Sequence, residues 1–182
     1  MIPDDPFRFL IHEIIEQMLS VKVGAIIFSR LEALCGEITP GHILLQTPEL
    51  LRSTGMSTTK VEYIQIIAHA VRSGSLCLEE LAGLPDEEVF KALTSIRGIG
   101  PWTAKMYLLF VLNRQNVLPV EDVAFQQSYR WLYKTVDVTP AAIMKKCQKW
   151  KPHSSIAARY LYRALDMGLT KTEFHLYKTV AL

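Results

Sequence analysis

The stretch "SIRGIGPWTAK", residues 95–105, places Gly98 and Gly100 two positions apart, directly before a proline and a segment of helical composition. Glycine adopts positive φ angles at little cost, and the absence of a side chain lets another molecule approach the backbone closely. Pro101 suits the first position of a helix, where its missing N–H leaves no hydrogen bond unmade. The stretch therefore predicts a hairpin, residues 96–100, between two helices.

Two interpretations of this hairpin remain open from these residues alone. Backbone N–H groups at the start of the second helix lack partners within the helix, and such groups suit a phosphate oxygen. The alternative is an ordinary helix–helix turn in which a glycine ends the first helix. A short glycine motif is weak evidence for either interpretation.

The rest of the chain is also helical in pattern. Apolar residues in 7–19 recur at helical spacing, and polar residues take the opposite face. Capping residues, prolines and glycines indicate where other helices begin and end. The expected helices cover 7–19, 21–34, short segments after Thr39 and Thr47, 57–72, a segment that begins at Pro85, 101–112, 122–133, 140–150, 154–167 and a last short one from Thr170.

No run of residues has the pattern and boundaries of a strand. We therefore predict an all-α fold of about ten helices with short connections, in a single domain over residues 1–182. The helix-hairpin-helix segment is expected at about residues 90–113.

Composition narrows the class of protein. The chain has 182 residues, 49% hydrophobic and 21% charged, which is typical of a globular domain. It contains no apolar run of about 20 residues and its N-terminus is acidic, so we expect a cytoplasmic protein without membrane segments. Cys35, Cys77 and Cys147 lack the spacing of a metal or iron–sulfur site, and buried thiols are expected. A net charge of +2 does not decide for or against a polyanionic partner.

A second motif follows the hairpin and a very apolar helix. In "NVLPVEDVAFQQSY", residues 116–129, Asp122 lies 22 residues beyond Gly100 and at the expected start of a helix. With this combination the chain resembles the helix-hairpin-helix (HhH-GPD) DNA glycosylases, in particular the 3-methyladenine DNA glycosylase II (AlkA-like) branch. The resemblance extends over roughly residues 5–167. Its five blocks are "EQMLSVKVG" (16–24), "GMSTTKVEYI" (55–64), "LTSIRGIGPWTAKM" (93–106), "LPVEDVAF" (118–125) and "KWKPHSSIAARYLYRAL" (149–165).

The resemblance implies a fold and an activity. It implies the compact multi-helix glycosylase fold, without the N-terminal β-rich domain of the long members and without an iron–sulfur cluster. The implied enzyme is a monofunctional N-glycosyl hydrolase of base excision repair, which flips alkylated purines of the 3-methyladenine type out of damaged double-stranded DNA. We expect a monomer that requires no cofactor and works in the nucleoid, or in the nucleus of a eukaryote.

The resemblance assigns the catalytic role to Asp122, whereas neighbouring Glu121 falls outside the family's fixed position. Cleaving an N-glycosidic bond creates a sugar with oxocarbenium character, and a fixed carboxylate stabilises that positive charge or orients the attacking water. The alternative is an aspartate that only caps a helix, and one side chain can serve both purposes.

The base pocket implied by the resemblance contains Trp102, Tyr162 and Met106. Strand-cleaving relatives carry a Schiff-base lysine where this chain has Trp102, so hydrolysis without strand cleavage is expected. The indole face would stack on a cationic base. Well-known members have tyrosine where this chain has Met106, which leaves the substrate range open. Trp102 and Tyr162 have an alternative as ordinary core aromatics, and Lys105 is expected to face solvent or phosphate.

The resemblance also implies how DNA is held. Backbone carbonyls of Thr94, Ile96 and Gly98 match ligands of a monovalent cation, Na⁺ or K⁺, and the amides of Gly98 and Gly100 match phosphate contacts. Met18 matches the wedge residue that fills the gap left by the flipped base. The alternative interpretation is that the Met18 side chain belongs to the hydrophobic core.

The last of the five blocks differs from the family's usual sequence at a position that bears on DNA binding. Ser154 stands beside Ser155, where relatives usually have arginine. A phosphate contact or a structural contact is therefore expected to be missing.

Other functions stay open at this point. One is a non-catalytic helix-hairpin-helix module that binds DNA, and Asp122 together with Trp102 argues against it. Another is a glycosylase for neutral bases such as uracil, hypoxanthine or a mismatched pyrimidine, which Met106 leaves possible. The missing cysteine cluster and the missing lysine disfavour the adenine-mismatch and thymine-glycol branches.

Overall fold

The computed structural model describes residues 5–174, which form ten α-helices and contain no strand. The predicted all-α fold is confirmed. By internal contacts the chain divides into two compact units, residues 1–113 and residues 114–182. The prediction of a single domain over 1–182 stays a prediction beside this division. In the described part of the chain, no helix has the length and hydropathy needed to cross a bilayer.

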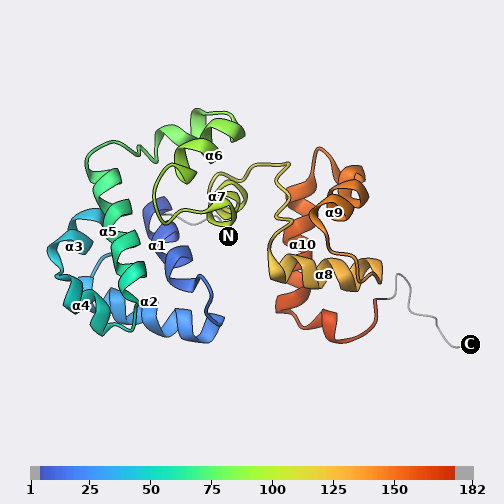
Figure 1. The fold of residues 1–182 in the computed structure, drawn as a ribbon. Helices are drawn as coiled ribbons and strands as arrows, with labels where there is room; N and C mark the ends of the chain where they lie inside the picture. The colour runs from blue at the N-terminus through green and yellow to red at the C-terminus, as the bar shows by residue number, and fades with distance from the viewer. Residues whose placement is uncertain (1–4, 175–182) are drawn as a thin grey trace, which may run out of the picture. The chain divides into compact units, whose positions relative to one another are not determined.

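The first unit holds the N-terminal helices, drawn from blue to yellow-green in Figure 1. Its central element is α1, which contacts α2, α5, α7 and η2. Four apolar side chains of α1 have no exposed surface, namely Leu10, Ile11, Ile14 and Ile15. The elements of this unit are α1 (Pro6–Glu16), α2 (Val21–Cys35), α3 (Pro40–Leu45), α4 (Pro48–Ser53), α5 (Thr58–Arg72), the 3₁₀ turn η1 (Glu80–Gly83), α6 (Asp86–Thr94), α7 (Pro101–Met106) and the π-helical turn η2 (Tyr107–Val111).

The second unit packs around the contact between α8 and α10. Its buried core consists of Val120, Phe125, Tyr129, Ile143, Cys147, Ala158 and Leu161. Aromatic rings at the edge of this core, among them Trp150 and Tyr162, lie within 6.5 Å of the Phe125 ring centre. The elements are α8 (Val123–Tyr133), α9 (Pro140–Cys147), the 3₁₀ turn η3 (Gln148–Trp150), α10 (Ser154–Asp166) and the 3₁₀ turn η4 (Leu169–Lys171).

Most helix starts lie where the capping residues predict them. Ser20, Thr39, Thr47 and Ser57 each accept a hydrogen bond from the backbone N–H three residues on, which satisfies one of the free donors of a first turn. Four further caps are Asp5 of α1, Gly100 of α7, Asp122 of α8 and Thr139 of α9. These starts fix where the loops between the helices lie.

Three helix ends differ from the prediction. The helix expected over 7–19 ends at Glu16, and the one expected over 101–112 is α-helical only to Met106 and continues as a π-helical turn. The helix expected over 140–150 becomes 3₁₀ after Cys147. In each case the residues beyond the end remain helix formers, so side-chain pattern alone did not reveal the change.

The expectation of three buried thiols is wrong for two of them. Cys147 is buried, whereas Cys35 at the end of α2 and Cys77 before η1 are partly exposed. All three are free. Burial raises the pKa of the Cys147 thiol to about 11, which keeps it protonated and unreactive at neutral pH.

Candidate active site and DNA-binding elements

The predicted hairpin connects α6 to α7. α6 ends at Thr94 with Ser95 as its C-cap, Gly98 has a φ of 104°, and Gly100 is the N-cap of α7 with a φ of −88°. The two glycines therefore have different reasons to be glycine. Gly98 adopts a backbone conformation that a residue with a Cβ rarely takes, whereas Gly100 has ordinary backbone angles.

Close packing adds a second constraint at Gly98. A Cβ placed there would lie 2.6 Å from Cγ of Tyr63 on α5, which is closer than real contacts allow. A Cβ at Gly100 would meet no atom within 4 Å. Gly98 thus lets the hairpin lie against α5, and Gly100 leaves the outer surface of the turn open.

The hairpin presents two unused backbone donors. Within residues 5–174, no atom accepts a hydrogen bond from the N–H of Gly98 or of Gly100. Both residues are partly exposed. Two amides beside the start of a helix can donate to a phosphate oxygen, which is the arrangement that the resemblance implies.

Two of the three carbonyls predicted to bind a cation accept hydrogen bonds from other residues. The carbonyl of Ile96 accepts from the N–H of Ile99 at 3.0 Å, and the carbonyl of Gly98 accepts from Nε2 of Gln17 at 3.3 Å. A cation at Gly98 would therefore face the positive end of an amide dipole. The cation site at Thr94, Ile96 and Gly98 stays a prediction.

Trp102 and Met106 lie one turn apart on α7. Trp102 is partly exposed in the first turn, and Met106 retains 3% of its exposed surface. The spacing of four residues places the two side chains on one face of the helix. In this unit Trp102 thus remains accessible to a ligand, whereas Met106 belongs to the core.

Met18 lies in the loop between α1 and α2 and is fully exposed, at 101%. Its φ of 58° is unusual for a residue with a side chain. The core alternative for Met18 is therefore wrong, because α1 ends before its apolar stripe would have included this residue.

Asp122 is the N-cap of α8. Its Oδ1 accepts from the N–H of Phe125 at 2.6 Å, and 9% of the residue is exposed. The partial positive charge at the start of this 11-residue helix favours a carboxylate there. Capping and catalysis thus require the same fixed position, and the structure realises the first of these roles.

Two contacts that were not predicted from the sequence stabilise the surroundings of Asp122. The ring centre of Phe125 lies 6.4 Å from that of Tyr162 on α10, and the Phe125 N–H donates to Asp122. Phe125 therefore contacts both predicted site residues of this unit, Asp122 and Tyr162. Gln126 donates from Nε2 to the carbonyl of Val120 at 2.9 Å, which fixes the loop before Asp122. Tyr162 packs against the second unit's core, as its structural alternative predicts.

Ser154 and Ser155 supply contacts of their own. Ser154 Oγ donates to Oδ1 of Asn116 at 2.8 Å, and Ser155 Oγ accepts from the N–H of Val117 at 2.8 Å. The Ser155 N–H donates to the carbonyl of Gln115 at 3.0 Å. The serines therefore join the start of α10 to the segment that leads to Asp122, and the loss of a contact made by the relatives' arginine stays a prediction.

The predicted site residues divide between the two units. The first unit carries the hairpin, Trp102, Met106 and Met18, and the second carries Asp122 and Tyr162. The residues predicted to hold DNA and the carboxylate predicted to be catalytic thus lie in different units.

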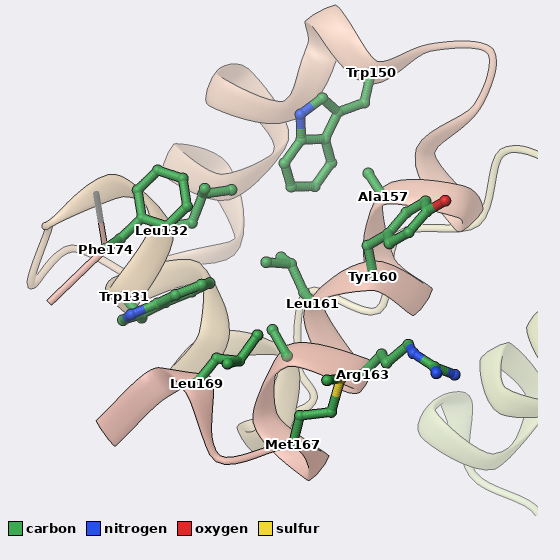
Figure 2. Close-up of a pocket in the computed structure, with 11 residues that line it drawn as sticks. Trp131, Leu132, Trp150, Ala157, Tyr160, Leu161, Arg163, Met167, Leu169 and Phe174 are labelled. Carbon is green, nitrogen blue, oxygen red and sulfur yellow. The ribbon is translucent and has the colours of Figure 1, made fainter. Parts of the chain in front are cut away.

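An apolar cavity of about 470 Å³ lies in the second unit between α8, α10 and η4. Figure 2 shows the rings of Trp131, Trp150 and Phe174 around it, with the Arg163 guanidinium directed away from them. None of the predicted site residues lines this cavity. The base pocket expected from the sequence is therefore a different place.

One cluster in the first unit has metal-ligating side chains. His12 lies between two carboxylates of α1, with Nδ1 3.3 Å from Glu13 and Nε2 3.5 Å from Glu16. The hydrogen bond that the His12 ring donates to the Glu13 carboxylate raises the pKa of His12. Because each ring nitrogen faces a different carboxylate, the geometry fits a protonated histidine held by two ion pairs.

Known proteins resemble this chain over most of its length. Residues 11–153 match the family model described as "HhH-GPD superfamily base excision DNA repair protein". DNA-3-methyladenine glycosylase 1 of Schizosaccharomyces pombe is 34% identical over 169 residues, which are 90% of this chain and 74% of that protein. DNA-3-methyladenine glycosylase 2 of Escherichia coli is 26% identical over 87% of this chain and 57% of its own length.

Two solved structures are also similar. The S. pombe 3-methyladenine DNA glycosylase in complex with abasic DNA superposes with a TM-score of 0.83 at 33% identity, covering 91% of this chain and 83% of that one. The DNA-3-methyladenine glycosidase of Bacillus halodurans gives a TM-score of 0.80 at 35% identity, over 92% of this chain and 79% of that one. The chain therefore belongs to the HhH-GPD superfamily of base excision DNA repair proteins.

Proposed function

We propose that this protein is a DNA glycosylase that removes alkylated purines of the 3-methyladenine type from damaged double-stranded DNA by hydrolysis. The observation that carries the proposal is its similarity, over nine-tenths of its length, to a protein named DNA-3-methyladenine glycosylase. The similarity to a glycosylase bound to abasic DNA supports duplex DNA as the partner. We further propose that the enzyme acts as a monomer, without a required cofactor, where chromosomal DNA is held.

Asp122 supplies the charge for the reaction in this proposal. The Phe125 N–H and the start of α8 hold the carboxylate in one place, so little reorganisation is needed when positive charge develops on the sugar. A base that carries an alkyl group on a ring nitrogen is already cationic and leaves readily. The carboxylate then stabilises the oxocarbenium-like sugar or orients the attacking water.

Trp102 selects the base in this proposal. Its partly exposed indole lies two residues after Gly100, in the first turn of α7. An indole face attracts a cation by about 2 kcal/mol where water is excluded, which favours an alkylated purine over a neutral one. Met106 is buried, so it influences the pocket through the packing of α7. This selection disfavours uracil and hypoxanthine as main substrates.

The same position predicts hydrolysis without strand cleavage. Position 102 offers no amine, so borohydride added during turnover of methylated duplex DNA should trap no protein–DNA adduct. In a parallel reaction without borohydride, which would otherwise reduce the abasic aldehyde and block elimination, the DNA should break at purines only after alkali. A trapped adduct that disappears with Lys105→Ala would contradict the assignment, and alkali-stable DNA in the reaction without borohydride would contradict the proposed function.

The charge distribution supports a DNA partner more strongly than the net charge of +2 does. Residues 1–113 contain nine Lys and Arg against 13 Asp and Glu, a net charge of −4, whereas residues 114–182 contain 11 against five, a net charge of +6. A surface hollow in the second unit is lined by Lys145, Lys146 and Lys149. In the described part of the chain none of these lysines forms an ion pair, so their charges are available to phosphate.

These lysines give a prediction about salt dependence. Lys146 and Lys149 each lie 5.1 Å from the ring centre of Tyr133, which keeps both ammonium groups on one surface. If both contact phosphate, replacing both with glutamine should reduce the slope of log affinity against log salt by about two. The matched control replaces the exposed Arg52 and Arg72 of the first unit with glutamine, which removes the same charge. Equal losses in both variants would show a general charge effect and contradict the prediction.

A further inference from the structure

The tip of the α1–α2 loop has a conformation that other residues must hold. α1 ends at Glu16, and Met18 follows with a φ of 58° and a fully exposed side chain. Positive φ is unfavourable for a residue with a Cβ, and an exposed side chain gains no packing in return. The conformation therefore depends on contacts made by neighbouring residues.

Lys60 of α5 makes one set of these contacts. Its Nζ donates to the carbonyl of Ile15 at 2.5 Å and to the carbonyl of Gln17 at 2.7 Å. The Ile15 carbonyl belongs to the last turn of α1 and Gln17 is its C-cap, and a cation is favoured at this end of a helix. Partial burial lowers the pKa of the Lys60 ammonium group, as expected for a cation withdrawn from water. Lys60 thus fixes the backbone on the N-terminal side of Met18.

Gln17 makes the second set and reaches the hairpin. Its Nε2 lies 3.3 Å from the Gly98 carbonyl and 3.2 Å from Oγ1 of Thr103. Gly98 lies within the turn, and Thr103 is a buried residue of α7. One side chain next to Met18 therefore contacts the hairpin at Gly98 and the helix that follows it at Thr103.

Helix α5 supports both ends of this connection. Lys60 holds the loop that carries Met18, and Tyr63, three residues further along the same helix, packs against Gly98. Residues three apart on a helix lie on the same face. The exposed tip and the hairpin amides are thus held by a common base within the first unit.

We propose that Gln17 and Lys60 are positioning residues that hold Met18 in register with the hairpin. When the hairpin binds a phosphate, this connection places the Met18 side chain at the base stack. The inference rests on the proposed function and assigns roles to two residues that touch neither the base nor the sugar.

A double-mutant cycle tests the connection. Gln17→Leu keeps the size of the side chain and removes both hydrogen bonds, and Met18→Ala removes the tip. The measurements are base release at saturating methylated DNA and the fluorescence of 2-aminopurine placed beside the lesion, which reports base extrusion. We expect Gln17→Leu to lower both signals about tenfold, because small displacements of a positioned group have large effects on rate. The affinity for undamaged DNA should change less than twofold.

Non-additivity is the decisive result. The variant with both substitutions should be no slower than Met18→Ala alone, because Gln17 acts through Met18. The matched control is Gln46→Leu, which removes a side-chain bond from the C-cap of α3 to the His42 carbonyl of that helix, and it should behave as wild type. Additive losses in the double variant would overturn the proposal.

Two variants of Lys60 test the same connection if the Gln17→Leu protein does not fold. Lys60→Arg retains donors for the Ile15 and Gln17 carbonyls, and Lys60→Met does not. If the two variants melt at the same temperature and only Lys60→Arg restores the wild-type 2-aminopurine fluorescence, the connection is supported. If the two variants give the same fluorescence, the proposal is overturned. If wild-type protein releases no base at all, the proposed function itself fails, whereas active wild type with unaffected Gln17 and Lys60 variants rejects only this inference.

Discussion

Asp122→Asn is expected to reduce the rate of base release by about 100-fold or more, because a fixed charge aimed at a developing opposite charge contributes several kcal/mol. Asparagine caps helices as well as aspartate does, so the bond from the Phe125 N–H can be kept. The variant should therefore fold normally and bind lesion-containing DNA with nearly unchanged affinity. Single-turnover kinetics with methylated duplex, paired with a binding titration, measure both quantities.

The neighbouring Glu121 provides the control. It is exposed, whereas Asp122 retains only 9% of its exposed surface. Glu121→Gln removes the same charge one residue away and should leave the rate within a few fold of wild type. Near wild-type turnover in Asp122→Asn would mean that this aspartate only caps α8.

The second large effect is expected at the hairpin, where the two glycines should respond differently. Gly98→Ala places a Cβ 2.6 Å from Tyr63 at a φ of 104°, so we expect a loss of about 1–3 kcal/mol in the free energy of unfolding. Gly100 has a φ of −88° and open space around it, so Gly100→Ala should melt like wild type. Gly100→Leu should also fold and cover the amides that face phosphate.

For Gly100→Leu we expect about tenfold weaker binding to any DNA duplex, damaged or not. A hydrogen bond to a charged group contributes about 1.5 kcal/mol or more, and phosphate contacts carry no sequence information. Thermal melts and affinities at two salt concentrations separate a folding defect from a binding defect. Unchanged affinity in a folded Gly100→Leu protein would return the hairpin to an ordinary helix–helix turn.

Local signals made most of the fold predictable. A side chain that caps a helix acts within three residues, so Ser20, Thr39, Thr47 and Ser57 could be recognised without any knowledge of tertiary contacts. The hairpin followed from glycine and proline chemistry in the same way. The family resemblance proposed from five sequence blocks is confirmed by the family model and by relatives over most of the chain.

Features that depend on distant residues could not be predicted. The apolar pattern of 7–19 continues through Met18, but the bonds from Lys60 and Gln17 favour an exposed loop there. The separation of charge between the two units was hidden in a net charge of +2 because its boundary is defined by tertiary contacts. The roles of Phe125 and Ser155 likewise follow from contacts that no short motif encodes.

Identification of the released base tests whether this protein excises alkylated purines with Asp122 as the carboxylate. Wild-type protein and Asp122→Asn are incubated with duplex DNA treated with a methylating agent, and the soluble products are separated by chromatography against standards. The account predicts that wild type releases 3-methyladenine as a free base and that Asp122→Asn releases about 100-fold less in the same time. Release of only neutral bases, or no release by a wild-type protein that binds the DNA, would contradict it.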